Sequence, residues 1–498
     1  MGKTAVVVGA GIAGIATSIR LAKLGYSVDV FESAKHAGGK MSSFLKEGYR
    51  FDGGPSLFTL PHLVDELFEL CNEKPQEHFQ YQSLDTICNY FFEDGTRFQA
   101  HKTWDEFNAS LANIATEGER KALQNHLKSA AFRYNITAPL FIEQSLHRAK
   151  NYVNFKTLKG LLSIPKLNLF QSMHRENSHR LKNKYLVQYM NRFATYNGSD
   201  PYRAPALLNM IPHLEQQLGS YYPQGGMASI PTSLYQLAVK QGVNFHFGHP
   251  VQEIIVQNKK AQGIRVLNPT IGETRTVLGD VVVSNADIYT TYKKLLPHVQ
   301  APEKTLNQER SSSALVFYWG IAASFPELHL HNILFSDDYK AEFQQLFGGG
   351  EPYHDPTIYI NITAKCDAQD APEGCENWFV MINVPSDVGQ DWGAITTAAR
   401  KHILAKLQRI LGRDIDPLIA CESVLDPIRI EANTSSQGGS LYGTASNNRF
   451  AAFLRHKNFS SDINGLYFCG GSVHPGGGIP LCLNSAKIVS NLVSEDRA

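Results

Sequence analysis

Apolar residues at the start of the chain follow the pattern of a strand, a helix and a second strand. Residues 4–8 (TAVVV) read as a buried parallel strand, and residues 15–25 (IATSIRLAKLG) repeat apolar positions at helical spacing up to a glycine. A second strand follows at residues 27–31 (SVDVF). This order predicts a parallel α/β unit at the beginning of the chain.

The turn between this strand and helix reads GAGIAG (residues 9–14), and the second strand leads into an acidic residue. The first glycine allows the tight turn, the second lets the backbone approach a pyrophosphate, and the third lets the helix pack closely on the strand; the acid would accept ribose hydroxyls. Because these features coincide, the segment favours a dinucleotide site over an ordinary glycine turn, without distinguishing FAD from NAD. The residues predicted to form it are Gly9, Gly11, Ile12, Ala13, Gly14 and Glu32.

Two further segments resemble parts of a large flavoprotein group that includes amine oxidases and carotenoid desaturases. One contains Gly38, Gly39 and Lys40, and the other reads FDGGPSLF at residues 51–58. Lys40 stands where that group usually has arginine. We expect it to keep a positive charge near the phosphates while losing the two-pronged hydrogen bonding of a guanidinium.

The rest of the chain predicts a second part interleaved with the first. Residues 75–200 alternate short aromatic-rich strands with helices, and α/β construction returns at residue 222, with later strands beginning near Val251 and at 280–287. Residues 311–425 supply apolar strands around one long helix, which predicts a mixed sheet that roofs a cavity. We therefore expect a discontinuous dinucleotide-binding domain made of residues 1–74, 222–295 and 426–498. The remaining divisions are a substrate-binding domain of residues 75–134, 200–221 and 296–425, and a helical, membrane-associating subdomain of residues 135–199.

Composition argues against several classes of protein. The chain has 498 residues, 43% of them hydrophobic, and 47 Lys and Arg nearly balance 46 Asp and Glu, which gives no bulk electrostatic reason to bind nucleic acid. The seven cysteines are scattered without a CxxC pair, which argues against a disulfide framework or a zinc ribbon and fits a reducing cytoplasm. No apolar run reaches ~18 residues, so no membrane-spanning helix is predicted.

Local charge, however, is uneven. Residues 148–184 carry nine Lys or Arg against one acid, Glu176, and these charges are interleaved with leucines, isoleucine and aromatic residues. One interpretation is a solvated basic helical face. The other is an interfacial element that holds the protein on anionic lipid, with Lys156, Lys159 and Lys166 among its cations.

In order and spacing, these motifs resemble the bacterial carotenoid desaturases, a family of phytoene-desaturase-like flavoproteins, over nearly the whole chain. Further anchors of the resemblance are YPQGGMASIP (222–231), VVSNAD (282–287), HNILFSDDYKAEF (331–343) and GLYFCGGSVHPGGGIPLCLNSAKI (465–488). The resemblance implies FAD as the cofactor and an α/β fold with a Rossmann-like FAD-binding domain. The FAD contacts implied, besides those of the first turn, are Gly39, Lys40, Ser56, Leu57, Val251, Asn285, Leu441, Gly470, Gly477 and Ile479.

The last of these segments also predicts a strand, a linker and a helix that could contact the flavin directly. It reads as a strand that ends at Gly470 and Gly471, a glycine-rich linker, and a helix that begins near Ile479. The N-terminus of such a helix can face the pyrimidine oxygen of a flavin and stabilise the negative charge that forms there on reduction.

By resemblance, the reaction removes two hydrogens from adjacent carbons of a polyene, by hydride transfer to the flavin and loss of a neighbouring proton. A cation beside a polyene is delocalised, so a strong protein base is not required. His474 and Glu431 lie in or near the flavin-associated segments and are the candidate acid–base residues, with packing or hydrogen bonding as the alternative role. His329 and His331 flank a short apolar strand and are interpreted as its polar edges; no metal site is predicted.

Within the family, the ending SVHPGGGIPL resembles the subgroup that acts on hydroxylated or methoxylated acyclic carotenoids, which implies a 1-hydroxycarotenoid 3,4-desaturase. Phytoene or diapophytoene desaturation, flavin-dependent carotenoid isomerisation and a non-catalytic escort of prenyl lipids remain alternatives. An NAD-dependent dehydrogenase is disfavoured because no second glycine fingerprint follows a strand. For the same reason we expect oxygen or a membrane quinone to reoxidise the flavin. A hydrophobic carotenoid substrate further implies that this enzyme, which the cysteine pattern places in the cytoplasm, attaches peripherally to the membrane.

Overall fold

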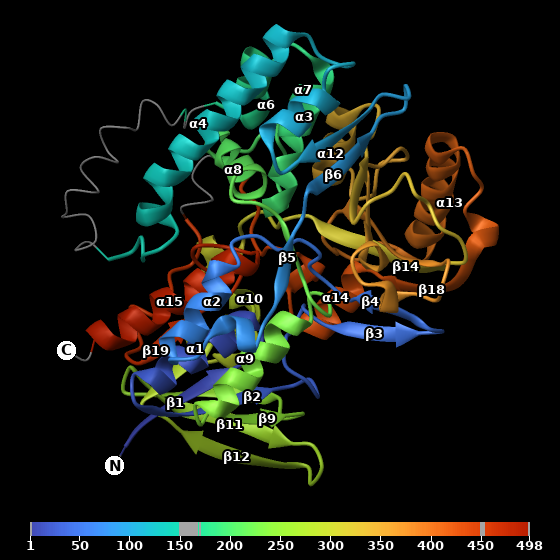
Figure 1. Cartoon of the computed structure of the whole chain (residues 1–498). Helices are drawn as coiled ribbons and strands as arrows, with labels where there is room; N and C mark the ends of the chain where they lie inside the picture. Colours follow the sequence, from blue (N-terminus) through green and yellow to red (C-terminus); the bar gives the residue numbers. More distant parts are fainter. Residues whose placement is uncertain (1, 149–167, 169–170, 449–453, 497–498) are drawn as a thin grey trace.

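A parallel sheet of five strands organises the part of the molecule that holds both ends of the chain (Figure 1). The structure is a computed structural model that describes residues 2–148, 168, 171–448 and 454–496. The strands come from three stretches that are far apart in the sequence, so the sheet is discontinuous, as predicted. In spatial order they are β19 (Leu466–Phe468), β13 (Val281–Ser284), β1 (Lys3–Val8), β2 (Tyr26–Glu32) and β9 (Asn244–Phe247).

Each face of this sheet has its own cover. In β1, Ala5 and Val7 point into the helical layer, whereas Val6 and Val8 point toward a three-stranded antiparallel sheet. This division follows from the alternation of side chains along a strand. The helices are α1 (Ile12–Lys23), α2 (His62–Leu70), α9 (Ser229–Lys240) and α15 (Ile479–Glu495), and the second sheet consists of β10 (Val251–Gln257), β11 (Lys260–Asn268) and β12 (Glu273–Leu278).

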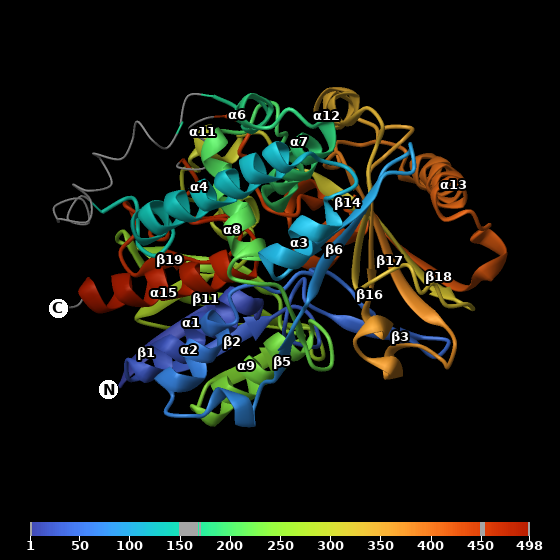
Figure 2. The same cartoon turned by 45° about the horizontal axis from the view of Figure 1, so that its top comes forward.

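A seven-stranded mixed sheet forms the second part of the molecule, and α13 (Trp392–Leu411) covers its outer face (Figures 1 and 2). Within β14 (Ser313–Ile321), Phe317 and Trp319 pack in the core under α13, whereas Ala314 and Val316 face the opposite side and line a cavity. The sheet therefore roofs a cavity, as expected. The other strands are β18 (Ile419–Leu425), β17 (Glu376–Val384), β16 (Ile358–Ile362), β15 (His331–Leu334), β6 (Thr86–Phe91) and β7 (Arg97–His101).

A group of helices lies above both sheets in Figure 1, and its longest member is α4 (Glu117–Phe141). The start of α4 is fixed by a capping box, in which Thr116 and Glu119 satisfy each other's backbone N–H groups. Glu176 is buried and paired with Arg133 and Arg180, so it belongs to an internal ion pair and not to a solvated face. The other members are α3 (Trp104–Ser110), α6 (Met173–Arg180), α7 (Lys184–Asn191), η4 (Arg192–Asn197), η5 (Ala206–Met210), α8 (Ile211–Gln216) and α12 (Tyr339–Gly348).

Short elements connect these layers. Two small antiparallel sheets pair β3 (Ser43–Lys46) with β4 (Tyr49–Asp52), and β5 (Tyr81–Ser83) with β8 (Tyr221–Pro223). The short helical turns are η1 (Pro75–Glu77), α10 (Ile288–Thr290), η6 (Thr291–Leu295), α11 (Glu303–Leu306), η7 (Thr363–Lys365), η8 (Ala368–Asp370), η9 (Asp416–Leu418), α14 (Pro427–Thr434) and η10 (Gln437–Gly439).

The predicted fold class is confirmed: a Rossmann-like α/β domain built from separated segments, with a mixed-sheet part inserted between them. Helix α4 runs through the boundary predicted after residue 134, so the helical region begins before that position. Within the described part of the chain, no helix is both long enough and apolar enough to cross a membrane. Lys156, Lys159 and Lys166 of the basic segment lie outside the described residues.

Candidate functional site

A cavity of about 1030 Å³ connects the two parts of the molecule. It begins at the turn after β1, passes under the inner face of the seven-stranded sheet and reaches α4. Small-molecule sites usually measure roughly 300–1,000 Å³. This cavity is therefore large enough for an elongated ligand.

The cavity collects the residues that the sequence predicted for cofactor binding. All of them except Gly14 line it, although they come from segments scattered over the whole chain. These residues are Gly9, Gly11, Ile12, Ala13, Glu32, Gly39, Lys40, Ser56, Leu57, Val251, Asn285, Leu441, Gly470, Gly477 and Ile479.

The turn after β1 leaves no room for side chains. Gly9 has a φ of 98°, and a Cβ on Gly14 would lie 2.1 Å from the Gly9 carbonyl oxygen, so Gly14 acts through helix–strand packing behind the wall. A Cβ on Gly11 would meet the Asn285 Oδ1 atom at 2.8 Å. Gly11 is also the N-cap of α1 and offers no side-chain cap, so the first N–H groups of this helix are available to an anion.

Glu32 closes this turn from the end of β2. Its Oε2 atom accepts a hydrogen bond from the Ala10 N–H at 2.7 Å, and Oε1 accepts one from the Ala34 N–H at 2.8 Å. The carboxylate thus fixes the backbone of the turn after β1 and of the segment after β2 while lining the cavity. Its position at the end of the second strand is the one expected for an acceptor of ribose hydroxyls.

Asn285 ties the ends of three neighbouring strands together. Its backbone N–H donates to the Val8 carbonyl at 2.8 Å, and its side-chain Nδ2 donates to the Cys469 carbonyl at 3.2 Å. A Cβ on Gly470 would approach Nδ2 to 2.6 Å. The glycines around Asn285 are therefore needed for the close approach of β1, β13 and β19.

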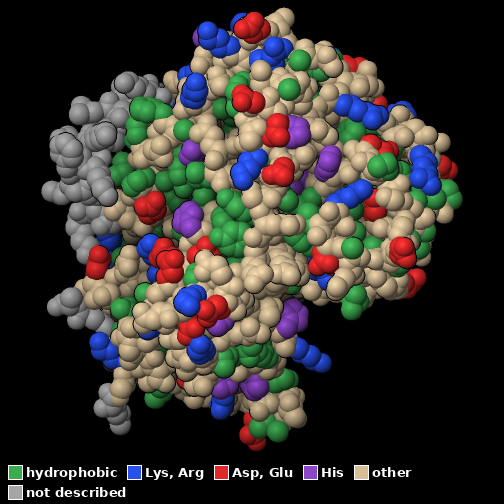
Figure 3. All heavy atoms as spheres, in the orientation of Figure 1, with side chains coloured by type: hydrophobic (Ala, Val, Ile, Leu, Met, Phe, Trp, Pro, Cys, Tyr) green, Lys and Arg blue, Asp and Glu red, His purple; other side chains and the backbone are tan. Residues whose placement is uncertain are grey.

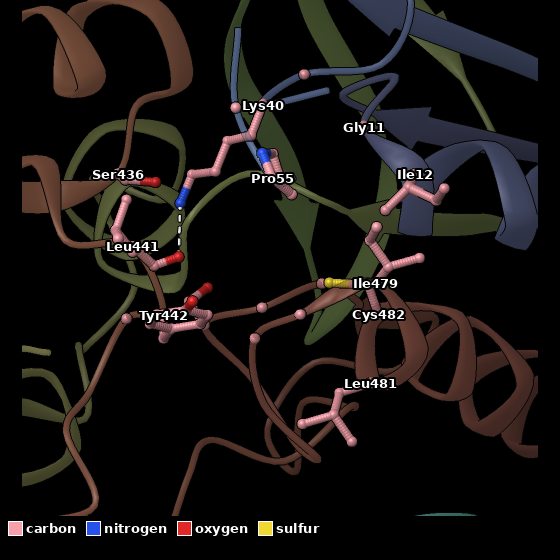
Figure 4. A pocket seen from close by; sticks show the side chains of 18 of the residues that line it. Gly11, Ile12, Lys40, Pro55, Ser436, Leu441, Tyr442, Ile479, Leu481 and Cys482 are labelled. Atoms are coloured by element: carbon pink, nitrogen blue, oxygen red, sulfur yellow. Dashed lines mark hydrogen bonds between the residues drawn. The ribbon is translucent and has the colours of Figure 1, made fainter. Parts of the chain in front are cut away.

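A second helix N-terminus meets the cavity at α15 (Figure 4). Its N-cap, Gly478, carries no side chain, and Pro480 occupies the first turn. A Cβ on Gly477 would lie 2.8 Å from the ring of Tyr442, so the linker and the wall are in direct contact. The arrangement leaves the first backbone N–H groups of α15 free of side-chain caps, as the charge-stabilising role predicted for this helix requires.

Lys40 crosses the cavity to the C-terminal wall, as Figure 4 shows. Its Nζ donates to the carbonyl oxygens of Leu441 at 2.9 Å and of Ser440 at 3.3 Å. Burial lowers the pKa of Lys40 from its ordinary value, and the carboxylate of Asp287 opposes this shift. The side chain is thus held by a segment that we expected beside the flavin ring or its ribityl chain, and its position near the phosphates stays a prediction.

The two candidate acid–base residues lie behind the cavity wall. The wall passes through Pro475, while the buried ring of His474 lies with Nε2 3.0 Å from the Gln144 carbonyl oxygen. Burial lowers the pKa of His474 to about 4, so the ring is neutral at pH 7. Glu431 accepts a hydrogen bond from the Gly438 N–H at 2.9 Å. Both contacts match the alternative role stated for these residues, hydrogen bonding within the fold.

Other polar residues, which the sequence did not predict as acid–base groups, line the roof of the cavity. His331, interpreted as a polar strand edge, is 3% exposed and hydrogen-bonds through Nδ1 to the Tyr359 hydroxyl at 2.7 Å. Tyr359 in turn lies 2.8 Å from Ser56 Oγ. Next to them, Arg192 pairs with Glu215, which also accepts a hydrogen bond from a tyrosine hydroxyl. Ser56 and His331 lie in segments that carry the resemblance, whereas no local motif marks the segments of the other three residues.

The fold and the glycine-lined cavity define a dinucleotide-binding protein. The family model described as flavin containing amine oxidoreductase matches residues 12–494, so the chain belongs to this family. The chain is 51% identical over 496 residues to a 1-hydroxycarotenoid 3,4-desaturase of Flavobacterium sp. (strain P99-3), with all of both chains covered. It is 32% identical to a 4,4'-diaponeurosporene oxygenase of Staphylococcus aureus (strain MSSA476), with 100% of this chain and 99% of that one covered.

Solved structures support the same fold. An oxidoreductase from Methanosarcina mazei superimposes with a TM-score of 0.65 at 16% identity, covering 99% of this chain and 100% of that one. The prediction of an FAD-dependent oxidoreductase is confirmed, and the cofactor is FAD. The two helix N-termini without side-chain caps and the glycines at which a Cβ would clash fit this cofactor.

Proposed function

We propose that the protein is an FAD-dependent carotenoid desaturase that introduces a double bond between carbons 3 and 4 of a 1-hydroxylated acyclic carotenoid. The observation that carries this proposal is the 51% identity over the whole length to the 1-hydroxycarotenoid 3,4-desaturase of Flavobacterium. A long cavity with an apolar roof supports it, because a polyene can lie there with its length in contact with side chains.

Different parts of the cavity wall would bind the cofactor and the substrate. The turn after β1, with Glu32 and Asn285, would hold the adenosine and pyrophosphate, while Leu57, Leu441 and the N-terminus of α15 would border the ring. Bound FAD supplies the acceptor for the hydride that leaves the substrate. The roof strands would exclude water and hold the polyene flat against that acceptor, and they contribute Ala314, Val316, Phe379 and Met381.

A direct test supplies the purified, FAD-loaded protein with a 1-hydroxylated acyclic carotenoid in liposomes. The expected product has lost two hydrogens and absorbs at longer wavelength, because the conjugated system is extended. A product of unchanged mass would support isomerisation, and a product heavier by one oxygen atom would support the chemistry named for the Staphylococcus relative. Conversion of phytoene or diapophytoene alone would support the other desaturases. Stable purification without flavin would support the escort protein. Each of these four results would overturn the proposal.

Because the substrate dissolves in lipid and not in water, the enzyme would take it from a membrane surface. The cavity reaches Tyr134, Thr137 and Phe141 in the second half of α4, and the chain then continues toward the basic segment 148–184. Figure 3 shows hydrophobic side chains on the same face, beside the grey atoms and across the middle of the molecule. These features support peripheral attachment and entry of the substrate near α4.

Changing Lys156, Lys159 and Lys166 together to glutamate tests this attachment. We expect weaker co-sedimentation with anionic liposomes and slower turnover of liposome-borne substrate, with the flavin still bound, because the cations that meet anionic head groups are lost. Binding of the wild type should also weaken with salt, since the Debye length is about 10 Å at 0.1 M. Unchanged co-sedimentation would return the segment to a solvated helical face.

The acceptor that reoxidises the flavin would be oxygen or a membrane quinone. Supplying each separately under otherwise anaerobic conditions distinguishes them, because turnover continues only with the acceptor that is used.

A further inference from the structure

Arg455 is a buried cation in the wall of the cavity. It is 3% exposed and lines the cavity beside the linker that leads into α15. Its Nη1 donates to the carbonyl oxygens of Tyr442 at 2.8 Å and of Gly471 at 3.3 Å, and Nη2 donates to that of Thr444 at 2.8 Å. The guanidinium therefore joins the segment 442–444 to the segment that follows β19.

Within the described part of the chain, no carboxylate pairs with this guanidinium. The other buried arginines in that part, Arg20, Arg133 and Arg192, each pair with a glutamate. Burial lowers the pKa of Arg455 to about 10, so the side chain is still charged at pH 7. A buried charge without an opposite charge costs stability. The protein alone thus leaves one charge in the cavity wall uncompensated.

This charge lies next to the start of α15. A Cβ on Gly476, in the linker, would lie 3.2 Å from Nε of Arg455, so the guanidinium packs directly on the linker. The charges of Lys40 and Arg455 both lower the pKa of Cys482, near the start of α15, against the larger effect of burial. Lys40 has a carboxylate nearby, that of Asp287, whereas Arg455 has none in the described structure. Arg455 therefore adds an unpaired positive charge to the positive end of the α15 helix dipole.

We propose that Arg455 raises the reduction potential of the flavin, because its unpaired charge stabilises the negative charge that forms on the ring. A hydride brings two electrons and one proton to a neutral ring, which leaves it with one negative charge. This inference rests on the position of the ring beside α15 in the proposed function, and not on the identity of the substrate. The interaction needs no direct contact, since charges in a poorly hydrated interior act over several ångströms.

The hydrogen bonds of Arg455 support an effect on the ring and not on the pyrophosphate. Leu441 and Gly470, which we expect around the ring or its ribityl chain, directly precede the carbonyl groups of Tyr442 and Gly471 that Arg455 binds. In Figure 4, Leu441 and Tyr442 form one wall of the cavity beside the start of α15. No hydrogen bond of Arg455 in the described structure reaches the turn after β1, where we expect the pyrophosphate.

Two substitutions separate this role from a purely structural one. Arg455→Lys keeps the charge but loses the planar set of donors, whereas Arg455→Gln loses the charge and can still donate to a backbone carbonyl. Arg20→Gln is the control, because Arg20 is also buried and paired with Glu66 at 2.7 Å but does not line the cavity. For each FAD-loaded protein the reduction potential is measured against a dye of known potential, without carotenoid, together with the Kd for FAD.

Arg455→Gln should lower the reduction potential by about 30 mV or more, which is a 10-fold change in the two-electron equilibrium. This is the effect expected of a full charge at roughly 10 Å with an effective dielectric constant of about 20. Arg455→Lys should keep most of the wild-type potential, and Arg20→Gln should leave it unchanged. The proposal is overturned if glutamine keeps the wild-type potential, if lysine and glutamine lower it equally, or if glutamine only weakens FAD binding, which would place the charge at the pyrophosphate.

The wild type offers a second measurement that does not depend on how the variants fold. If the reduced ring carries a negative charge, one proton accompanies two electrons, and the potential should fall by about 30 mV per pH unit from about pH 6 to 8. A slope of about 59 mV per pH unit would mean that the reduced ring is neutral and would overturn the proposal. Because no carotenoid is present, both results are independent of whether the protein desaturates the proposed substrate.

Discussion

Replacing Glu32 with alanine tests how the first turn holds the adenosine half of FAD. In the wild type both carboxylate oxygens are engaged, one by the Ala10 N–H at 2.7 Å and the other by the Ala34 N–H at 2.8 Å. Ala10 is fully buried, so its N–H would be left without an acceptor in Glu32→Ala. The substitution therefore acts on the protein alone as well as on the ribose contact that we propose.

The two effects have separate magnitudes. Loss of a hydrogen bond from a ribose hydroxyl to a carboxylate costs about 1.5–3 kcal/mol, which corresponds to FAD binding weaker by roughly 10- to 150-fold. The unpaired Ala10 N–H costs about 1–3 kcal/mol in the free energy of unfolding, whether or not FAD is bound. The first effect appears in the Kd for FAD, and the second in the thermal stability of the apoprotein.

Both quantities can be measured on the same preparations, by titrating apoprotein with FAD and following flavin fluorescence, and by melting the apoprotein. Asp29→Asn is the matched control, because Asp29 lies on the same strand and pairs with His246 at 2.8 Å, away from the cavity lining. We expect its Kd for FAD to match that of the wild type. If Glu32→Ala binds FAD within about two-fold of the wild type, which is below one hydrogen bond, the ribose role of Glu32 is refuted.

Two further predictions concern stability. Gly14→Ala would place a Cβ 2.1 Å from the Gly9 carbonyl oxygen and should destabilise the fold by about 1–3 kcal/mol or more, whereas Gly118→Ala, with open space around it, should not lower the melting temperature. Burial lowers the pKa of His126 from 6.5 to about 4, so protonation of the unfolded chain should reduce stability by about 1.4 kcal/mol per pH unit as the pH falls from 6.5 to 4. In His126→Gln, which can still donate to Asn177, urea denaturation at several pH values should show this slope reduced by that amount; an unchanged slope contradicts the assignment.

Features encoded by neighbouring residues could be predicted from the sequence. The first strand, the helix that follows and the helix starting at Ile479 lie where periodicity and glycines placed them. The strand predicted at 280–287 ends earlier, at Ser284, because the Asp287 side chain accepts a hydrogen bond from the Tyr289 N–H and starts α10. A short capping residue and a strand residue are hard to distinguish in an apolar run that continues into a turn.

Contacts between segments that are distant in the sequence could be predicted less well. The glycine-rich segments identified the cofactor cavity because their backbone conformation is a local property, and resemblance supplied the remaining lining residues. The hydrogen-bond partner of Lys40 is not a sequence neighbour. Its Nζ donates to the carbonyl of Leu441, which lies near the other end of the chain. Charge and spacing predicted a cation in this region but not which segment it would contact.

His331 shows the same limit most clearly. Two histidines around the apolar residues of a short strand are typical of exposed strand ends, and this interpretation would hold for a strand at the edge of a sheet. β15, however, lies between β16 and β6, and β6 joins it in parallel from more than two hundred residues earlier in the chain. Because side chains alternate along a strand, His331 and Ile333 then share the cavity face while Leu334 packs in the core under α13. The burial that leaves the Nε2 atom of His331 without a partner in the described structure therefore depends on a non-local strand pairing, and no pattern within β15 itself could have indicated it.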